Sequence, residues 1–413
     1  MVAYYFPPIG GIGSIRAASF ARFLPEFGWQ ATVLAPADTP HAPDRSLDVG
    51  QAPVVRTRSF ELSRLGRRPA ADDGGDTEVA APHQPVARPL PSRWLRRMGK
   101  QVVFPDAQIG WYPAAAAGGI RLLRERPFDL IFSSSFPITS HLVARTLKRR
   151  SSLPWVAEFR DPWSDDEEFR LVSAPALRVE RAMAAEADAV VLPNQTWAQH
   201  YSRRWGVDAS VIGHGSDAAF PRPVRRPGPP VLAYVGSYLP DRQRLETLWL
   251  ALAVMRQRGY ATPRLRWVGA VPQEARAELE RHGLEDILDA TGYVSQSEAL
   301  SQMSTASGLV ASGFVDTGPV SLGTTPAKLL EYVASGVPII YVGHPHGEPG
   351  RMLSRYPGCH VVPFGDVDGA IRAVQTALSD EVHQREVAGL SRRARTAELA
   401  GLFDNIVARR AGG

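Results

Sequence analysis

The feature that most constrains how this sequence can fold is a repeated alternation of short apolar runs with longer stretches of helical pattern. The strands predicted in the first half are Val2–Phe6, Ala31–Leu34, Leu130–Ser133, Trp155–Glu158 and Ala189–Leu192. Those predicted in the second half are Val231–Val235, Arg264–Val268, Gly308–Ala311 and Pro338–Val342. Strands that alternate with helices form mainly parallel sheets, because each return to a parallel neighbour needs a crossover. The pattern therefore predicts an α/β fold.

A Pro- and Arg-rich run, Phe220–Pro230, separates the two sets of strands and is typical of an interdomain linker. We expect an N-terminal domain over residues 1–222, a C-terminal domain over 223–385 and a final helical segment over 386–413. Residues 66–92 hold few large apolar side chains, and we interpret them as a mobile surface loop. Two α/β domains place a ligand cleft at the carboxyl ends of their sheets.

Composition and charge exclude several classes of protein. A single cysteine, Cys359, excludes an internal disulfide and any cysteine-based metal site. No apolar run has the length of a membrane-spanning helix, and the first residues do not resemble a signal peptide. The net charge of +5 is modest, and no nucleic-acid-binding motif is present. We therefore expect a soluble, cytoplasmic protein that binds no nucleic acid.

The first motif is a glycine-rich tract, Pro7–Arg16, between a predicted strand and a helix over about Ile15–Leu24. Glycines let the backbone approach a ligand, and Ser14 is a candidate cap for a helix whose N-terminus attracts anions. Arg16 in the first turn is unfavourable unless an anion lies nearby. A dinucleotide site is disfavoured because Arg16 stands where its third glycine belongs. A merely tight turn remains the alternative.

A second motif, Phe159-Arg160-Asp161-Pro162-Trp163, follows the predicted strand Trp155–Glu158. Arginine, carboxylate and indole together suit sugar recognition, with the carboxylate accepting from hydroxyl groups and the ring stacking on the sugar. The alternative is an Arg–Asp pair that only fixes the loop. The acidic run Asp165–Glu168 suggests a solvated helix start rather than a metal site, so we predict no metal.

The second half carries two further motifs. A predicted strand ends at Val235-Gly236-Ser237, and Arg242 and Arg244 follow before a helix, where guanidinium groups suit phosphate. The segment Thr324–Tyr332 predicts a helix with Thr325 as its cap, Pro326 as its first residue and Lys328 in its first turn. A bound diphosphate would reverse the unfavourable position of that lysine. Surface charge is the alternative in both places.

Together these motifs resemble a known family, the retaining glycosyltransferases of family 4 with the GT-B fold. Its bacterial members share tracts similar to Tyr5–Arg16, Phe159–Trp163 and Pro326–Tyr332. A Gly-His-Gly-Ser-Asp tract at Gly213–Asp217 is similar to the family's Asn-Gly-x-Asp, with His214 in place of Asn. The resemblance covers nearly the whole chain. It implies two Rossmann-like domains that face each other across a cleft, with a C-terminal crossover helix packed on the first.

The resemblance also assigns residues to roles, with the donor held mainly by the second domain and the acceptor by the first. Glu331 would bind the ribose, and Lys328 with Arg242 the diphosphate. The residues assigned to the donor are Gly11, Gly13, Arg16, Gly236, Ser237, Thr324, Thr325, Lys328 and Glu331. The residues assigned to the acceptor sugar are Arg160, Trp163 and His141. The catalytic assignments are Asp161, Lys328 and Arg242.

The sequence departs from the family pattern at three places. Gly323 stands where many members have a second glutamate, Ser237 where an arginine often follows the glycine, and Arg160-Asp161 where many have a histidine. The resemblance implies a nucleoside-diphosphate sugar as donor. We expect no cofactor or metal, and a front-face substitution in which the leaving diphosphate takes the acceptor's proton. The acceptor is a carbohydrate, lipid-linked or secondary-metabolite hydroxyl. A nucleotide-sugar epimerase and a non-catalytic nucleotide-sugar-binding protein are the alternatives.

Residues 93–104 mix arginines with Trp94 and other large apolar side chains beside the predicted loop. Such a composition suits peripheral contact with an anionic membrane, at the inner face for a cytoplasmic protein. An ordinary amphipathic helix packed on the domain is the favoured alternative.

Overall fold

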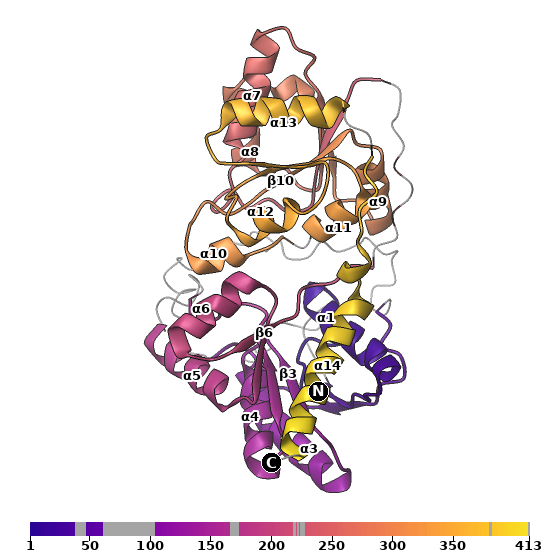
Figure 1. Ribbon diagram of the computed structural model, residues 1–413, viewed down its shortest axis with the longest axis vertical. Coiled ribbons are helices and arrows are strands. Elements are labelled where there is room, and N and C mark those ends of the chain that lie inside the picture. The colour runs from indigo at the N-terminus through magenta and orange to yellow at the C-terminus, as the bar shows by residue number, and fades with distance from the viewer. Residues whose placement is uncertain are drawn as a thin grey trace, which may run out of the picture. The chain divides into compact units, whose positions relative to one another are not determined.

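The computed structural model describes residues 1–37, 47–60, 104–165, 173–217, 220, 223, 228–326, 328–379 and 382–411. The predicted loop at 66–92, nearly all of 93–104 and most of the predicted linker lie outside these residues. The chain forms two compact units, which we call the first and the second unit (Figure 1). The first consists of Met1–Gly215 and Ser391–Gly413, and the second of Ser216–Leu390.

The first unit is built on one parallel sheet. Its strands are β1 (Val33–Pro36), β2 (Val54–Thr57), β3 (Ile131–Ser134), β4 (Trp155–Glu158), β5 (Ala189–Leu192) and β6 (Ala209–Val211). The expected first strand, Val2–Phe6, is present only as a bridge at Val2, which pairs with Leu34 of β1 and Ser133 of β3. That bridge joins β2-β1 to β3-β4-β5-β6, so the order is β2-β1-Val2-β3-β4-β5-β6.

Helices cover both faces of this sheet. They are α1 (Ile12–Phe23), α3 (Tyr112–Glu125), α4 (Thr139–Ser151), α5 (Ser173–Glu186), α6 (Gln195–Trp205) and α14 (Arg392–Ala411), with short 3₁₀ turns η1 (Leu24–Phe27) and η3 (Ile109–Trp111). One buried cluster unites the sheet with α3, α4, α5 and α6. A second unites it with α1 and α14, through Phe20 of α1 and Phe403 of α14 around Phe132. The C-terminal helix α14 thus belongs to the first unit.

The second unit has its own parallel sheet, in the order β12-β11-β10-β7-β8-β9. The strands are β7 (Val231–Val235), β8 (Arg264–Val268), β9 (Leu288–Gly292), β10 (Gly308–Ser312), β11 (Ile339–Val342) and β12 (Cys359–Val362). The helices are α7 (Glu246–Gln257), α8 (Gln273–Arg281), α9 (Gln296–Ser304), α10 (Pro319–Gly323), α11 (Lys328–Ser335), α12 (Glu348–Leu353) and α13 (Val367–Ser379), with η5 (Glu285–Ile287) and η6 (Ala388–Leu390). Figure 1 shows α7, α8 and α13 on one face and α11 and α12 on the other, each face with its own core.

Both sheets have the strand order of a doubly wound nucleotide-binding fold. Counted in chain order, the second sheet runs 3-2-1-4-5-6, and the first runs the same way with Val2 as its first strand and β6 added at the edge. The chain direction of the crossovers reverses between strands 1 and 4, and ligands bind outside the carboxyl ends at that switch point. The prediction of two Rossmann-like domains is confirmed, and the switch points are Val2–β3 and β7–β10.

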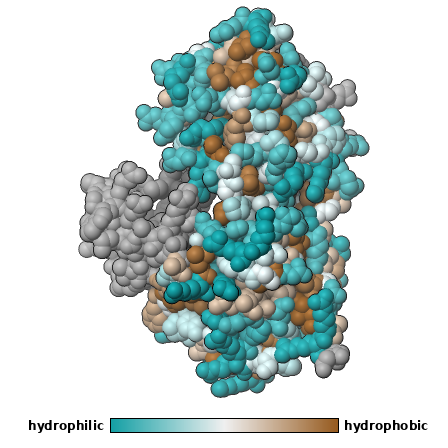
Figure 2. Space-filling view, turned by 60° about the vertical axis from the view of Figure 1, so that its left-hand side comes forward, coloured by the Kyte–Doolittle hydropathy of each residue, from teal (hydrophilic) through white to brown (hydrophobic). Residues whose placement is uncertain are grey.

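Hydrophilic residues cover most of the described surface on the face shown in Figure 2, with apolar residues distributed among them. Among the described helices, none is long and apolar enough to span a membrane.

Candidate functional site

The glycine-rich tract lies at the switch point of the first unit, between Val2 and α1. Gly11 precedes α1 with φ +92°, a backbone conformation that residues other than glycine adopt only under strain. A Cβ on Gly13 would lie 3.2 Å from Tyr5 Cγ, so this glycine lets the helix pack closely on that ring. The predicted cap is wrong: Ser14 lies inside α1, fully buried, because the helix begins two residues earlier than Ser14.

Arg16 is placed differently from its predicted role as a donor ligand. Its Nε donates to Glu158 Oε1 at 2.8 Å, and its two terminal nitrogens donate to the carbonyls of Ile212 and Gly213. The side chains of Arg16 and Glu158 are 8% and 1% exposed. Arg16 therefore ties α1 to the ends of β4 and β6, and its donors are largely used within the protein.

Arg160 follows β4 and approaches the same glycine tract. Its Nη1 donates to the Gly13 carbonyl at 2.7 Å, and burial lowers the pKa of its guanidinium. The structure thus brings together two motifs that the sequence placed only after two separate strands. Asp161 is exposed and interacts electrostatically with Arg160, at the mouth of the sheet where a substrate group would arrive. Its catalytic role stays a prediction.

Trp163 and His141 do not line an open site. The Trp163 ring is fully buried, 5.7 Å from the Phe104 ring, and the backbone N–H groups of Trp163 and Ser164 donate to buried Glu180. The predicted stacking of Trp163 on a sugar is wrong because that turn folds the ring into the core.

His141 is also fully buried, with its Nδ1 2.8 Å from Ser133 Oγ and its ring against Phe159. Burial lowers the pKa of His141 to about 3, so it is a neutral core residue. Its predicted contact with an acceptor sugar is wrong for the same reason as that of Trp163.

In the second unit, three predicted donor residues meet at the end of β7. Gly236 turns the chain with φ +99°, and Lys328 Nζ donates to the Ser237 carbonyl at 3.3 Å. The same ammonium lies 3.5 Å from the centroid of the Tyr234 ring. Burial lowers the pKa of Lys328 well below its usual value, although the residue is only half-buried by its exposed surface. Lys328 forms no ion pair with any residue in the described part of the chain.

The helix that carries Lys328 is held against β7 by a buried tyrosine. Tyr332 Oη lies 2.8 Å from the backbone nitrogen of Val235, where β10 no longer pairs with β7. Glu331 is half-buried, three residues beyond Lys328 and on the same side of α11.

Two details of the predicted helix start are wrong. Thr325 and Pro326 precede the helix, which begins at Lys328, and Leu329 N donates to the Pro326 carbonyl at 2.9 Å. Thr324 closes the preceding α10, because its Oγ1 donates to the Val320 carbonyl at 2.9 Å.

Arg242 is exposed in the loop after β7. Its guanidinium lies 5.7 Å from the centroid of the Phe314 ring, and its carbonyl accepts from Val315 N at 2.9 Å. The loop after β7 is thereby fastened to the loop after β10, on the two strands that flank the switch point.

Sequence reasoning missed Glu158, Tyr332 and Arg395 of α14. Glu158 had a signal, since a carboxylate ends an otherwise apolar strand. Arg395 had none, because its place beside Gly213 depends on where the last helix packs: a Cβ on Gly213 would lie 3.4 Å from Arg395 Cζ.

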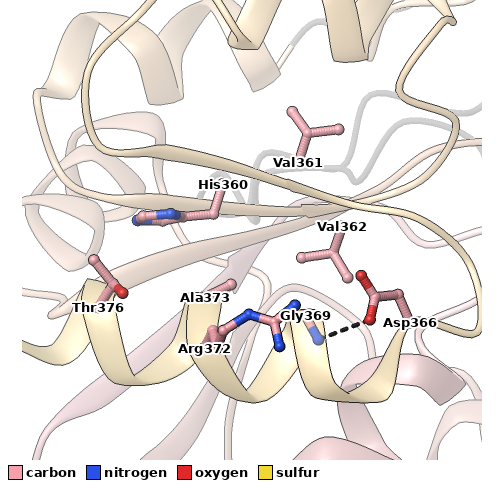
Figure 3. Close-up of a pocket in the computed structure, with 8 residues that line it drawn as sticks. All are labelled: His360, Val361, Val362, Asp366, Gly369, Arg372, Ala373 and Thr376. Carbon is pink, nitrogen blue, oxygen red and sulfur yellow. Dashed lines mark hydrogen bonds between the residues drawn. The ribbon is translucent and has the colours of Figure 1, made fainter.

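A separate hollow of about 320 Å³ lies between edge strand β12 and α13 (Figure 3). None of the predicted site residues lines it. The Asp366 carboxylate drawn there accepts from Gly369 N at 2.8 Å and so satisfies the start of α13. Gly11, Gly13 and Lys328 lie instead beside the switch points of the two sheets.

Two protein-family models match the chain over most of its length. One is described as "Glycosyl transferase 4-like domain" and matches residues 10–215, and the other as "Glycosyl transferases group 1" and matches residues 229–380. No curated protein sequence matches the chain.

Solved glycosyltransferase structures share the fold along nearly the whole chain. The lipopolysaccharide outer core galactosyltransferase WaaB in its apo form has a TM-score of 0.61 at 14% identity, covering 98% of each chain. Sucrose-phosphate synthase from Thermosynechococcus elongatus has a TM-score of 0.59 at 18% identity, covering 100% of this chain and 96% of that one. HepE of Anabaena, solved with UDP, has a TM-score of 0.54 at 15% identity, covering 100% and 97%. The predicted GT-B fold class is confirmed.

Proposed function

The chain belongs to the group 1 glycosyltransferases and has a glycosyl transferase 4-like N-terminal domain. We propose that it moves a sugar from a nucleoside-diphosphate sugar to an acceptor hydroxyl with retention of configuration. The family supplies the reaction class. The diphosphate donor, the retained configuration and the roles of individual residues are what we add.

The observation that carries the donor assignment is the cation at the end of β7. Lys328 holds its ammonium against an aromatic face and one carbonyl, where burial lowers its pKa, and without an ion pair among the described residues. A buried ammonium is costly unless an anion compensates it, and a diphosphate is such an anion. Gly236 and Ser237 offer exposed backbone beside it. Glu331, on the same side of α11, is then proposed to accept from the ribose hydroxyls. HepE was solved with UDP and with UDP-glucose, which makes UDP the first probe.

In the proposed reaction the bond from the anomeric carbon to the diphosphate oxygen breaks, and the acceptor oxygen bonds to the same face of that carbon. The acceptor's proton passes to the departing diphosphate. Lys328 and Arg242 stabilise the negative charge that grows on this leaving group. Stabilisation of this kind by fixed charges is usually the largest single contribution to an enzyme's rate acceleration. We propose that these cations suffice without a metal ion, and that Asp161 orients the reacting groups.

The acceptor is proposed to bind the first unit through Arg160 and Asp161, and to be a carbohydrate, a lipid-linked sugar or a secondary metabolite. The predicted membrane contact through 93–104 lies almost wholly outside the described residues and stays a prediction. Sedimentation with anionic vesicles at low salt tests it, and no binding there would favour a soluble acceptor.

A panel of UDP-, GDP-, ADP- and dTDP-sugars, with nucleotide release and product masses as readouts, tests the proposed function. We expect one donor class to release its nucleoside diphosphate and EDTA to leave the rate unchanged. The anomeric configuration of the product, followed by NMR, tests retention. Lys328→Ala should abolish most release, whereas Arg276→Ala, an exposed arginine of α8, should not. Donor turnover to an epimer without release would favour the epimerase, and binding without turnover the non-catalytic protein.

A further inference from the structure

His214 lies in the segment after β6, close enough to three arginines on three elements for their charges to act on it. Arg16 comes from α1, Arg160 from the turn after β4 and Arg395 from α14. Burial lowers the pKa of His214 to about 3, and the charges of these three guanidinium groups lower it further. His214 is therefore a neutral imidazole close to three cations.

The backbone around His214 is fixed on two sides. The carbonyls of Ile212 and Gly213 accept from Arg16, and Gly213 packs against the Arg395 guanidinium, where a Cβ would approach Cζ to 3.4 Å. A Cβ on Gly215 would lie 2.8 Å from the backbone of Arg392. The segment is thus packed between α1 and α14.

Carboxylates accompany two of the arginines but do not satisfy them fully. Glu158 accepts from Arg16 Nε at 2.8 Å, and Glu398 accepts from Arg395 Nη1 at 2.6 Å. Asp161 is exposed beside Arg160. The carboxylates leave the Nε groups of Arg160 and Arg395 without an acceptor.

Three buried hydrogen-bonding groups close to Gly13 and Gly213 lack a partner in the described part of the chain. The Nε groups of Arg160 and Arg395 and the hydroxyl of Ser14 are buried and have no hydrogen-bond partner among the described residues. Such groups are rare in native proteins and commonly indicate a water or an ion that belongs there. Donors on three elements, surrounded by positive charge, fit the several acceptor oxygens of one anion.

We propose that Arg160, Arg395 and His214 form a binding site for an oxyanion, a phosphoryl or carboxylate group, in the first unit. This inference rests on the proposed function, because it concerns what the transferase binds there. The oxyanion can belong to the donor's diphosphate or to an acidic acceptor, and the two sources share the same chemistry. In this site the neutral imidazole of His214 would donate a hydrogen bond to that oxyanion.

Isothermal titration of the full chain with pyrophosphate, with sulfate and with UDP tests the site. We expect Arg395→Gln and His214→Ala each to weaken pyrophosphate binding about 10-fold or more, the scale of a lost charged hydrogen bond. Arg409→Gln, an exposed arginine at the other end of the same helix, is the matched control and should change nothing. If Arg395→Gln melts early, Arg395→Lys replaces it, since it keeps the charge but loses the Nε donor.

Lys328→Ala separates the two sources. If sulfate and pyrophosphate still bind this variant and binding still depends on Arg395, the oxyanion is that of an acceptor. If UDP binding needs both Lys328 and Arg395, the site holds the donor's diphosphate. Folded Arg395 and His214 variants that bind all three probes within twofold of the wild type would overturn the site while leaving the proposed function intact. UDP binding that is indifferent to Lys328 would instead count against the proposed donor placement.

Discussion

The two units share one strand order yet hold their cations in opposite ways. At the first switch point Arg16 is locked by Glu158 and two carbonyls and is 8% exposed. At the second, the Lys328 ammonium contacts the Tyr234 ring and the Ser237 carbonyl, and no carboxylate of the described chain pairs with it. A cation that is satisfied within the protein organises the backbone, whereas one that is left partly unsatisfied is available to a ligand.

The largest effect is expected from breaking the locked cation. Arg16→Met should lower the free energy of unfolding by about 3–5 kcal/mol, because Glu158 would remain buried without its partner. Denaturant unfolding followed by circular dichroism measures this. Arg22→Met, on the same helix and paired with exposed Asp48, should cost less than about 1 kcal/mol. Equal losses for the two variants would mean that Arg16 is no more structural than a surface charge.

A variant of Asp161 tests whether a residue of the first unit takes part in catalysis. Asp161→Asn should keep the fold and donor binding while lowering turnover by about 10²–10⁴-fold, the scale of a positioned polar catalyst. Steady-state rates with donor and acceptor, beside a thermal melt, give the measurement. Activity within a few-fold of the wild type would assign Asp161 to holding its loop.

A pair of variants on α11 tests whether Lys328 and Glu331 bind the donor. Lys328→Ala should lower kcat and raise the donor KM, because its contact strengthens as the leaving group gains charge. Glu331→Ala should mainly raise KM, since ribose contacts are equal in ground and transition states. Each effect is expected to be about 10- to 150-fold.

Thermal melts sharpen the contrast between Lys328 and Arg16. Without ligand, Lys328→Ala should melt no lower than the wild type, because burial already disfavours the ammonium. With UDP the variant should lose most of the ligand-induced shift. A variant that melts lower alone but keeps its full shift with UDP would make Lys328 structural, like Arg16.

The smallest effect concerns the pH dependence of His214. Its pKa is about 3 in the folded protein and 6.5 ordinarily, so the unfolded chain binds more protons between these values and stability falls as pH drops through them. His214→Asn removes this term, so its stability relative to the wild type should rise by about 2.5 kcal/mol from pH 7 to pH 4.5. Saturating sulfate should reduce that difference. A pH-independent difference would mean that the arginines do not act on this imidazole.

The sequence by itself determined the two-domain α/β class and the buried strands. Trp155–Glu158, Ala189–Leu192, Val231–Val235 and Arg264–Val268 were predicted with the bounds that the structure has. The first three are largely apolar because both their faces are covered, whereas Arg264–Val268 alternates arginines with buried apolar residues. The strands β2, β6, β9 and β12 were missed because they are half-exposed sheet edges, whose side chains carry no continuous apolar signal.

Local pattern also placed Gly236 and Ser237 at the end of a strand and Lys328 in the first turn of a helix. Only the tertiary structure decided that Trp163 and His141 turn into the core, that Arg16 is used up by Glu158, and that Arg395 of the last helix stands beside His214. Strand and helix periodicity depends on neighbours along the chain, whereas burial and pairing of a side chain depend on residues far away in sequence. The arginine from α14 completes a site whose other members lie in the first half of the chain, and no local pattern encodes that meeting.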